Sequence, residues 1–171
     1  MSQIHRPGTR EYSPGYTDIL GNYKPFISNI LTSLHDKGID VSNLVMDHIG
    51  YQASSDVDYD SLKSEFDRIG LCIKETTVNG RRVGIYKLFS PLTYDHYRNT
   101  AIELYAPKKG QICSSGLEHV EFVIDDFDTF LQQYPKIPWD LSAISQKDFP
   151  QIKLPLENNT QVKFHLHALV D

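Results

Sequence analysis

Two strand-like segments with the same residue order constrain this chain more than any other feature. The first runs Asp47-His48-Ile49-Gly50-Tyr51, and the second runs Glu118-His119-Val120-Glu121-Phe122. In both, an acid is followed by histidine, an aliphatic residue, a small or polar residue and an aromatic residue. Each is followed, some tens of residues later, by a strand-like segment with a ligand-type residue at its centre, at 101–105 and at 163–167. The repetition predicts two copies of one module that could share a metal ion.

Hydrophobic periodicity supports this division into two halves behind a helix. Apolar residues from 17 to 35 follow the spacing of an amphipathic helix, which Pro25 could kink or split. Asn79-Gly80 is a strong signal for a tight hairpin between two strands. Both halves then show the order β-α-β-β-β, with a loop from 91 to 99 in the first half. The predicted strands lie at 44–53, 71–77, 82–89 and 100–105, and at 117–124, 141–144, 152–156 and 161–169.

The chain length of 171 residues suits one compact domain or two small modules with a common core. We expect a flexible lead at 1–15, an N-terminal helix at 16–40, and a single domain at 41–171. That domain would contain two βαβββ modules, at about 44–110 and 116–171.

Strand alternation assigns the polar side chains of these segments to one face. His48, Glu103, His119 and His165 would all lie on that face, opposite a mainly apolar one. A solvated sheet face needs no function, and a single histidine of this kind is more often a hydrogen-bonding residue than a ligand. Three imidazoles and one carboxylate at corresponding places in a duplicated pattern are nevertheless what a shared metal site requires.

The segments at 46–51, 102–108, 116–122 and 163–167 resemble the vicinal oxygen chelate superfamily, which includes glyoxalase I, extradiol dioxygenases and bleomycin-resistance proteins. Within it, the chain resembles the YecM-like proteins. The resemblance implies an α+β fold in which two βαβββ modules form a curved half-barrel sheet with helices outside, plus an N-terminal amphipathic helix. It also implies one divalent metal ion between the modules.

The resemblance further implies that His48, Glu103 and His119 are metal ligands. The fourth ligand would be His165, or His167 as the alternative on the same face, where glyoxalases commonly have a glutamate. Glu121 is the nearest acidic residue that could act as a catalytic base. We expect substrate-binding roles for Tyr105 and His167, and for Arg82 if it is not simply a solvated flank of the hairpin.

Three neutral histidines and one glutamate around a divalent ion leave a charge of about +1, which favours an anionic or enolisable ligand. The ligand types suit Zn, Ni, Fe or Mn. We therefore expect a metal-dependent isomerase, lyase or dioxygenase that acts on a small, oxygen-rich, metal-chelating molecule. The alternatives are a non-catalytic small-molecule binding module of the same fold, and a structural protein whose histidines only satisfy core hydrogen bonds.

The net charge of −5 argues against nucleic acid or a membrane surface as a partner, since both select a concentrated basic face. The two cysteines form no CxxC pair, and the first fourteen residues lack the apolar core of a signal peptide. We therefore expect a cytoplasmic protein with reduced thiols, as a monomer or homodimer.

Overall fold

The structure is a computed structural model and describes residues 15–170, so that almost all of the expected flexible lead at 1–15 lies outside the described residues. The chain enters through two helices, α1 (Tyr16–Leu20) and α2 (Tyr23–Asp36). The helix predicted at 17–35 is therefore split, at Gly21, whose φ is 75°. Pro25 falls in the first turn of α2, where its missing N–H disrupts no helical hydrogen bond.

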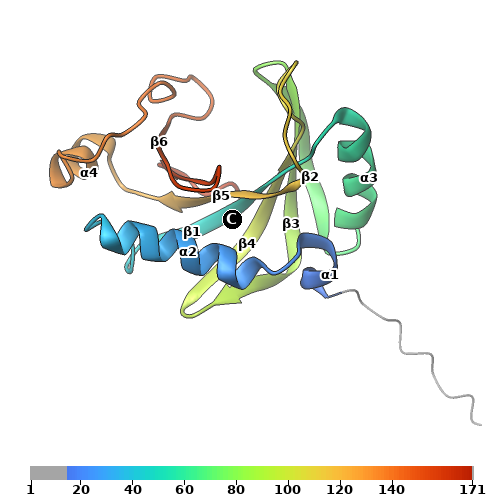
Figure 1. Cartoon of the computed structure of the whole chain (residues 1–171), viewed down its shortest axis with the longest axis horizontal. Helices are drawn as coiled ribbons and strands as arrows, with labels where there is room; N and C mark the ends of the chain where they lie inside the picture. The colour runs from blue at the N-terminus through green and yellow to red at the C-terminus, as the bar shows by residue number, and fades with distance from the viewer. Residues whose placement is uncertain (1–14, 171) are drawn as a thin grey trace, which may run out of the picture.

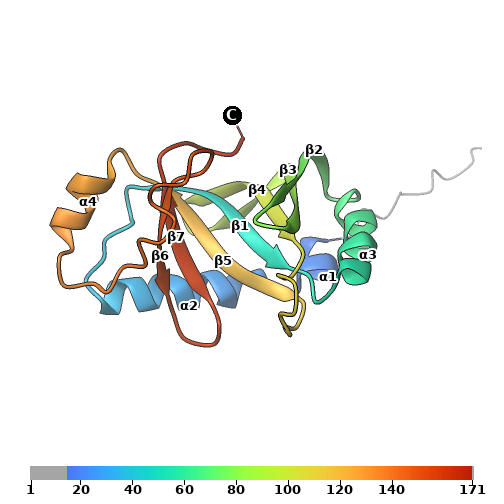
Figure 2. The same cartoon turned by 90° about the horizontal axis from the view of Figure 1, so that it is seen from above.

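Within residues 15–170, seven strands form one mixed sheet in the order β2-β3-β4-β1-β5-β7-β6 (Figures 1 and 2). The central strands β1 and β5 pair antiparallel, and each has a parallel neighbour, β4 beside β1 and β7 beside β5. Helix α3 follows β1, and helix α4 follows β5. The bounds are β1 (Val45–Gln52), α3 (Asp56–Phe66), β2 (Gly70–Val78), β3 (Arg81–Tyr94), β4 (Tyr97–Tyr105), β5 (Gly116–Val123), α4 (Phe127–Gln133), β6 (Gln151–Pro155) and β7 (Gln161–His165).

The second half has one strand fewer than predicted. The prediction of a strand at 141–144 is wrong. Those residues form no strand, and only a single β-bridge forms next to them, between Asp140 and Lys153. The Asp140 carboxylate instead accepts a hydrogen bond from the Ser142 backbone N–H at 2.9 Å, which turns the chain away from the sheet edge. In the first half β2 is the edge strand. At the corresponding edge of the second half, only Asp140 among the described residues pairs with the sheet.

The first half differs from the prediction in its longest hairpin. The loop expected from 91 to 99 is instead the tip of the β3–β4 hairpin, and Tyr94 pairs with Tyr97 across a two-residue turn. Asp95 takes a φ of 51° in that turn, a conformation that aspartate tolerates better than most residues. The strand was not predicted because Pro91 lies within it, and proline is uncommon inside strands. The structure places Pro91 within an irregular stretch of the β3–β4 pairing, between Lys87 and Leu92, where a missing N–H is tolerated.

The two faces of the sheet have different coverings. The helices pack on one face over a continuous apolar core, to which α2 contributes Ile27, Ile30 and Leu34, α3 Tyr59 and Phe66, and α4 Phe130. The opposite face carries the polar side chains of the central strands. Beside them, Val83, Ile85 and Tyr105 pack against Leu169 and Val170 of the C-terminal segment. Figure 2 shows that segment on the side of the molecule away from α2.

The longest helix in the described range is α2, with 14 residues, and none of the described helices is long and apolar enough to cross a bilayer.

Candidate metal centre

Four side chains from three adjacent strands converge on the polar face of the sheet. His48 comes from β1, Glu103 from β4, and His119 and Glu121 from β5; each offers one ligand atom, and these atoms all lie within 4.8 Å of one another. His48 Nε2 lies 3.5 Å from Glu103 Oε2 and 3.4 Å from Glu121 Oε2. His119 Nε2 lies 3.4 Å from Glu121 Oε1. Bonds of about 2.1 Å around a tetrahedral ion separate neighbouring ligand atoms by about 3.4 Å, so the spacing suits one ion.

The acid in each acid-histidine pair orients the imidazole. His48 Nδ1 donates to Asp47 Oδ2 at 2.7 Å, and His119 Nδ1 donates to Glu118 Oε2 at 2.5 Å. A carboxylate at Nδ1 fixes the tautomer and leaves the Nε2 lone pair for a metal, an arrangement typical of metal-binding histidines. The remaining nitrogens point into the four-residue cluster.

Two β-bulges explain how neighbouring residues of a strand can meet in this way. In the β1–β5 ladder, Met46 pairs with Phe122 and His48 with Glu121, so Asp47 is an extra residue. On the other strand, His119 and Leu117 pair with consecutive residues of β1, so Glu118 is also an extra residue. A bulge breaks the strict alternation of faces and re-aims a side chain. The acid-histidine repeat in the sequence is therefore the signature of two matched bulges.

Both orienting acids are themselves held. The Leu169 backbone N–H donates to the two Asp47 oxygens at 3.2 and 3.0 Å. Glu118 accepts hydrogen bonds from the Tyr105 hydroxyl and from Gln161 Nε2. These contacts restrict the carboxylates, which in turn restrict the rings.

Gly50 provides the space that His119 occupies. A Cβ atom at Gly50 would lie 1.9 Å from His119 Cε1, far inside van der Waals contact with a ring that is fully buried. The glycine is thus required by the close approach of a side chain from the paired strand, rather than by its own backbone angles.

The electrostatics of the cluster are dominated by buried negative charge. Burial alone would lower the pKa of His48, but the carboxylates of Glu121, Asp47 and Glu103 outweigh burial and raise that pKa well above its usual value. Burial alone would raise the pKa of Glu103, yet the close contact with His48 and the charge of Lys163 lower it to about 2. The pKa of Glu121 is held well below its usual value by His48 and Lys163.

These features fit a divalent metal ion. His48 Nε2 is buried without a hydrogen-bond partner, which is an unfavourable state for a polar atom unless something binds it. Four carboxylates, those of Asp47, Glu103, Glu118 and Glu121, lie in or beside the cluster and are at least four-fifths shielded from solvent. One ammonium group, on Lys163, faces them. The donor set of two imidazoles and two carboxylates suits Zn, Ni, Fe or Mn.

A local two-fold relation between β1 and β5 corrects the sequence alignment of the halves. Rotation about the Ile49–Val120 pair exchanges His48 with His119 and Gly50 with Glu121. Gly50 then pairs with Glu103 on β4, and Glu121 with Lys163 on β7. Lys163 therefore matches Glu103, whereas the alignment of the sequences placed His165 there.

His165 matches Tyr105 and lies at the edge of the cluster. It joins Asp47 and His48 in a second group of close ligand atoms. Its Nε2 lies 3.2 Å from Asp47 Oδ2 and its Nδ1 3.2 Å from Glu121 Oε2, but neither contact has good hydrogen-bond geometry. His167 is exposed, follows the end of β7, and belongs to neither group.

The expected substrate-binding residues have different surroundings. Tyr105 lines the cluster, with its ring stacked on His119 at 5.6 Å. Arg82 lies on the helix-covered face, where it pairs with Asp60 at 2.7 Å and stacks on Tyr59. Its neighbour Arg81 instead lies over the Tyr105 ring, 4.6 Å from the centroid. The structure thus brings Arg81, which sequence reasoning did not select, closer to the candidate centre than Arg82.

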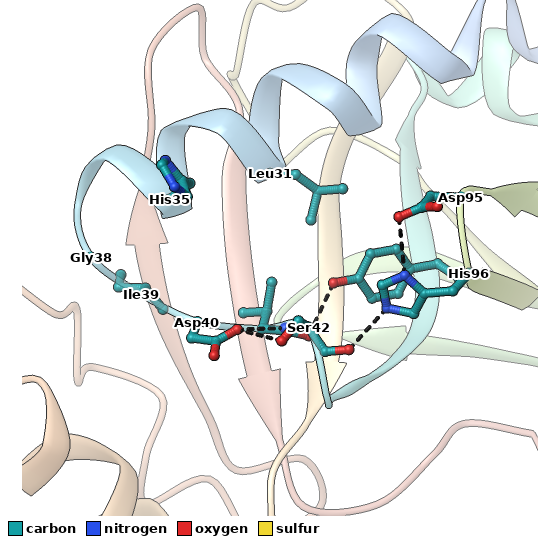
Figure 3. A pocket seen from close by; sticks show the side chains of 10 residues that line it. Leu31, His35, Gly38, Ile39, Asp40, Ser42, Asp95 and His96 are labelled. Atoms are coloured by element: carbon teal, nitrogen blue, oxygen red, sulfur yellow. Dashed lines mark hydrogen bonds and ion pairs between the residues drawn. The ribbon is translucent and has the colours of Figure 1, made fainter.

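A separate hollow of about 450 Å³ lies between the end of α2 and the tip of the β3–β4 hairpin (Figure 3). His96 Nε2 lies 2.9 Å from the Ser42 carbonyl oxygen, and Tyr97 donates to the Val41 carbonyl at 3.0 Å. These contacts fasten the hairpin tip to the segment after α2. The hollow has no lining residue in common with the four-residue cluster.

Comparisons with known proteins support the fold. The sequence profile of the YecM protein family matches residues 15–171. Protein YecM of Escherichia coli is 25% identical over 107 residues, an alignment that covers 63% of this chain and 57% of that relative, so the match spans little more than half of its length. A solved structure described as protein EC4020 is 20% identical, with a TM-score of 0.76 and coverage of 94% of this chain and 96% of that one.

A methylmalonyl-CoA epimerase from Mycobacterium tuberculosis is 13% identical, with a TM-score of 0.55 and coverage of 78% of this chain and 96% of that one. The expected α+β fold with a curved sheet, and the expected resemblance to the YecM-like proteins, are confirmed.

Proposed function

This chain belongs to the YecM protein family, and we propose that it binds one divalent metal ion through His48, Glu103, His119 and Glu121. The observation that carries the proposal is the spacing of the four ligand atoms, together with the carboxylate behind each histidine. Glu121 then has a role as a ligand, in addition to the role of base that the sequence suggested. His165 would support the centre from the side through Asp47 and Glu121.

We further propose that the centre serves an enzyme of the isomerase, lyase or dioxygenase type that acts on a small, oxygen-rich molecule. A bound metal ion supplies Lewis-acid polarisation of a substrate oxygen. The chain itself contributes Glu103 and Glu121, two carboxylates beside the reacting position that can accept a proton. A second carboxylate is more than a two-histidine, one-carboxylate iron site needs, and this favours isomerase or lyase chemistry.

Access to the centre would run past the C-terminal segment. His48, His119 and Glu121 are at most 3% exposed, and Glu103 is the most accessible of the four. Leu169 and Val170 pack beside them on Val83, Ile85 and Tyr105. Movement of this short segment would uncover the sheet face and would break the hydrogen bonds from the Leu169 N–H to Asp47.

The same enclosure is what favours the second candidate, a non-catalytic binding module. Such a module would hold its ligand without turning it over, and the ligand would raise the melting temperature by mass action. Turnover of any enolisable oxygen-rich compound by the metal-loaded protein would exclude it.

The metal proposal is tested by elemental analysis of purified protein reconstituted separately with Zn, Ni, Mn, and Fe under anaerobic conditions. We expect one ion per chain for at least one metal, and loss of that ion in His48→Ala and in His119→Ala. The matched control is His35→Ala, which removes an exposed histidine from α2 and should retain the metal.

A metal bound only by the folded state also stabilises it, by about 2.7 kcal/mol when the free metal is at a hundred times its Kd. Chelation should therefore lower the melting temperature of the wild type and leave His48→Ala unchanged. Absence of a stoichiometric metal from the wild type would refute the proposal. So would a metal content in His48→Ala and His119→Ala equal to that of the wild type.

A further inference from the structure

Lys163 stands where the other half of the molecule has a proposed metal ligand. In the parallel pair β1–β4, Glu103 lies beside Gly50; in the matching pair β5–β7, Lys163 lies beside Glu121. The local two-fold relation thus exchanges a carboxylate for an ammonium group. A lysine ammonium is not a metal ligand, so this position must have a different use if the centre binds a metal.

The side chain is buried and aimed at the centre. Lys163 is 5% exposed, and it is the only lysine or arginine among the buried residues of the range 15–170. Its Nζ lies 3.3 Å from Glu121 Oε1 and 3.4 Å from His119 Nε2. Both contacts are with atoms that the proposed metal ion would bind.

Metal binding would change what the ammonium can contact. The lone pair of His119 Nε2 cannot serve both a metal ion and a Lys163 N–H, so one of the three ammonium donors would lose its acceptor. A buried ammonium group with an unused donor is unfavourable, and an anionic oxygen in the open part of the coordination sphere would satisfy it.

Charge points the same way. Glu103 and Glu121 neutralise a divalent ion, and the two histidines add no charge while they act as ligands. Lys163 then places one positive charge beside the neutralised ion on the side of β7, whereas the other two carboxylates, Asp47 and Glu118, lie at the Nδ1 atoms of the histidine rings. An anionic ligand oxygen would pair with that ammonium group, whereas a neutral diol or amide would not.

Resting on the proposed metal site, we propose that Lys163 Nζ binds an anionic oxygen of the molecule that chelates the metal. The centre would thereby select small carboxylates with a second oxygen on the adjacent carbon over neutral molecules of the same shape. Lys163 is then a specificity residue for the ligand and not a requirement for the metal.

The experiment uses full-length protein loaded with the metal that binds best, and oxalate as the simplest anionic probe with adjacent oxygens. Calorimetric titration compares the wild type with Lys163→Met and Lys163→Gln, two uncharged side chains of similar length. We expect oxalate to bind the wild type and to bind both variants about tenfold to hundredfold more weakly, the effect of losing one hydrogen bond to a charged group. Oxamide, the neutral analogue, should bind weakly to all three proteins.

The matched control is Lys153→Met, because Lys153 lies directly beside Lys163 on β6 and its partner is Asp140. It should bind oxalate as the wild type does. Metal content is measured before and after titration, to exclude stripping of the metal by oxalate. Both Lys163 variants should keep one ion per chain, with equal or higher affinity, since a positive charge beside the site is removed.

Three outcomes are decisive. Weaker oxalate binding in both Lys163 variants, with metal content intact, supports the inference. Equal oxalate binding in metal-loaded wild type and Lys163 variants, or no oxalate binding by the metal-loaded wild type, overturns it and leaves the metal site standing. A wild type that binds no metal overturns the proposed function itself.

Discussion

The β1–β4 half and the β5–β7 half share a framework and differ in the side chains that they place on it. Each half has a bulged acid-histidine pair on its central strand, Asp47-His48 in one and Glu118-His119 in the other. Two other matched positions differ in chemistry, since Gly50 corresponds to Glu121 across the local two-fold, and Glu103 corresponds to Lys163. The duplicated part orients two imidazoles, and the divergent part sets the charge and the open side of the centre.

The largest expected effect comes from adding a side chain at Gly50, whose counterpart in the other half is Glu121. Gly50→Ala places a Cβ atom 1.9 Å from the His119 ring, which must move away from the cluster. Overpacking of this kind costs about 1–3 kcal/mol, and displacement of the ring should also abolish metal binding. Denaturant unfolding and metal analysis measure the two effects.

Gly116→Ala is the matched control, because a Cβ atom at Gly116 meets nothing within 4 Å. It should retain the metal and change the free energy of unfolding by less than about 0.5 kcal/mol. Normal metal binding by Gly50→Ala would show that His119 does not need its observed position.

The next effect tests whether the two orienting acids are equivalent. Asp47→Asn and Glu118→Gln should each weaken metal binding about tenfold to hundredfold, as is usual for the hydrogen-bonding partner of a metal-binding histidine. Asp47→Asn should cost more stability in metal-free protein, because the Asp47 side chain is 3% exposed against 17% for Glu118, and because Asp47 also contacts His165. Chelator competition and denaturant unfolding report the two quantities. Unchanged metal affinity in either variant would show that its acid does not orient a metal-binding histidine.

Acid should destabilise the metal-free protein through both halves. Burial alone would raise the pKa of Asp47, but the close contact with His165 and the hydrogen bond from His48 lower it from 3.8 to about 2. The pKa of Glu118 falls from 4.5 to about 2, because hydrogen bonding to His119 likewise outweighs burial. A lowered folded-state pKa gives stability that is present above the unfolded value and lost as the pH falls through the folded value. The free energy of unfolding should therefore decline between about pH 4.5 and pH 2.

Glu118→Gln should reduce the steepness of that decline, and Asp47→Asn should do the same. Unfolding in urea at a series of pH values, with chelator present, measures the slopes. An equal slope in the wild type and both variants would contradict the assigned pKa values.

The smallest effect concerns Arg81 and Arg82, neighbours on opposite faces of β3. Arg82→Ala removes a partly exposed ion pair with Asp60 and should shift the melting temperature by a few degrees at most, with no change in metal affinity. Arg81→Ala removes the cation above Tyr105 and should act on the centre through the Tyr105–Glu118–His119 contacts. A change of metal affinity in Arg82→Ala alone would reverse this assignment of faces.

The sequence was sufficient to predict the fold and the convergence of His48, Glu103 and His119. The repeated acid-histidine pattern and the alternation of side chains along a strand can both be recognised in a single sequence. It did not reveal that Lys163, rather than His165, matches Glu103. Both lie on the same face two residues apart, and only the pairing of β5 with β7 decides between them. Histidine is the more familiar ligand, and this favoured the wrong register.

The bulges at Asp47 and Glu118 also could not be predicted from the alternation of residues along a strand. Strict alternation would turn each acid away from its histidine, and the extra residue that prevents this is visible only in the pairing of β1 with β5. The strand expected at 141–144 failed for a local reason, the turn that Asp140 forms with Ser142. In each case a contact between segments, or a side chain bonded to the backbone, overrode the pattern.

The central claim is that one metal ion lies among His48, Glu103, His119 and Glu121. Anomalous diffraction at the absorption edge of the bound metal tests it most directly. We predict a single peak per chain at about 2.0–2.2 Å from the two Nε2 atoms and from one oxygen of each glutamate, with Lys163 Nζ outside bonding distance. A crystal of metal-loaded protein with no peak there, or with its peak among Asp47, His48 and His165, would contradict the account.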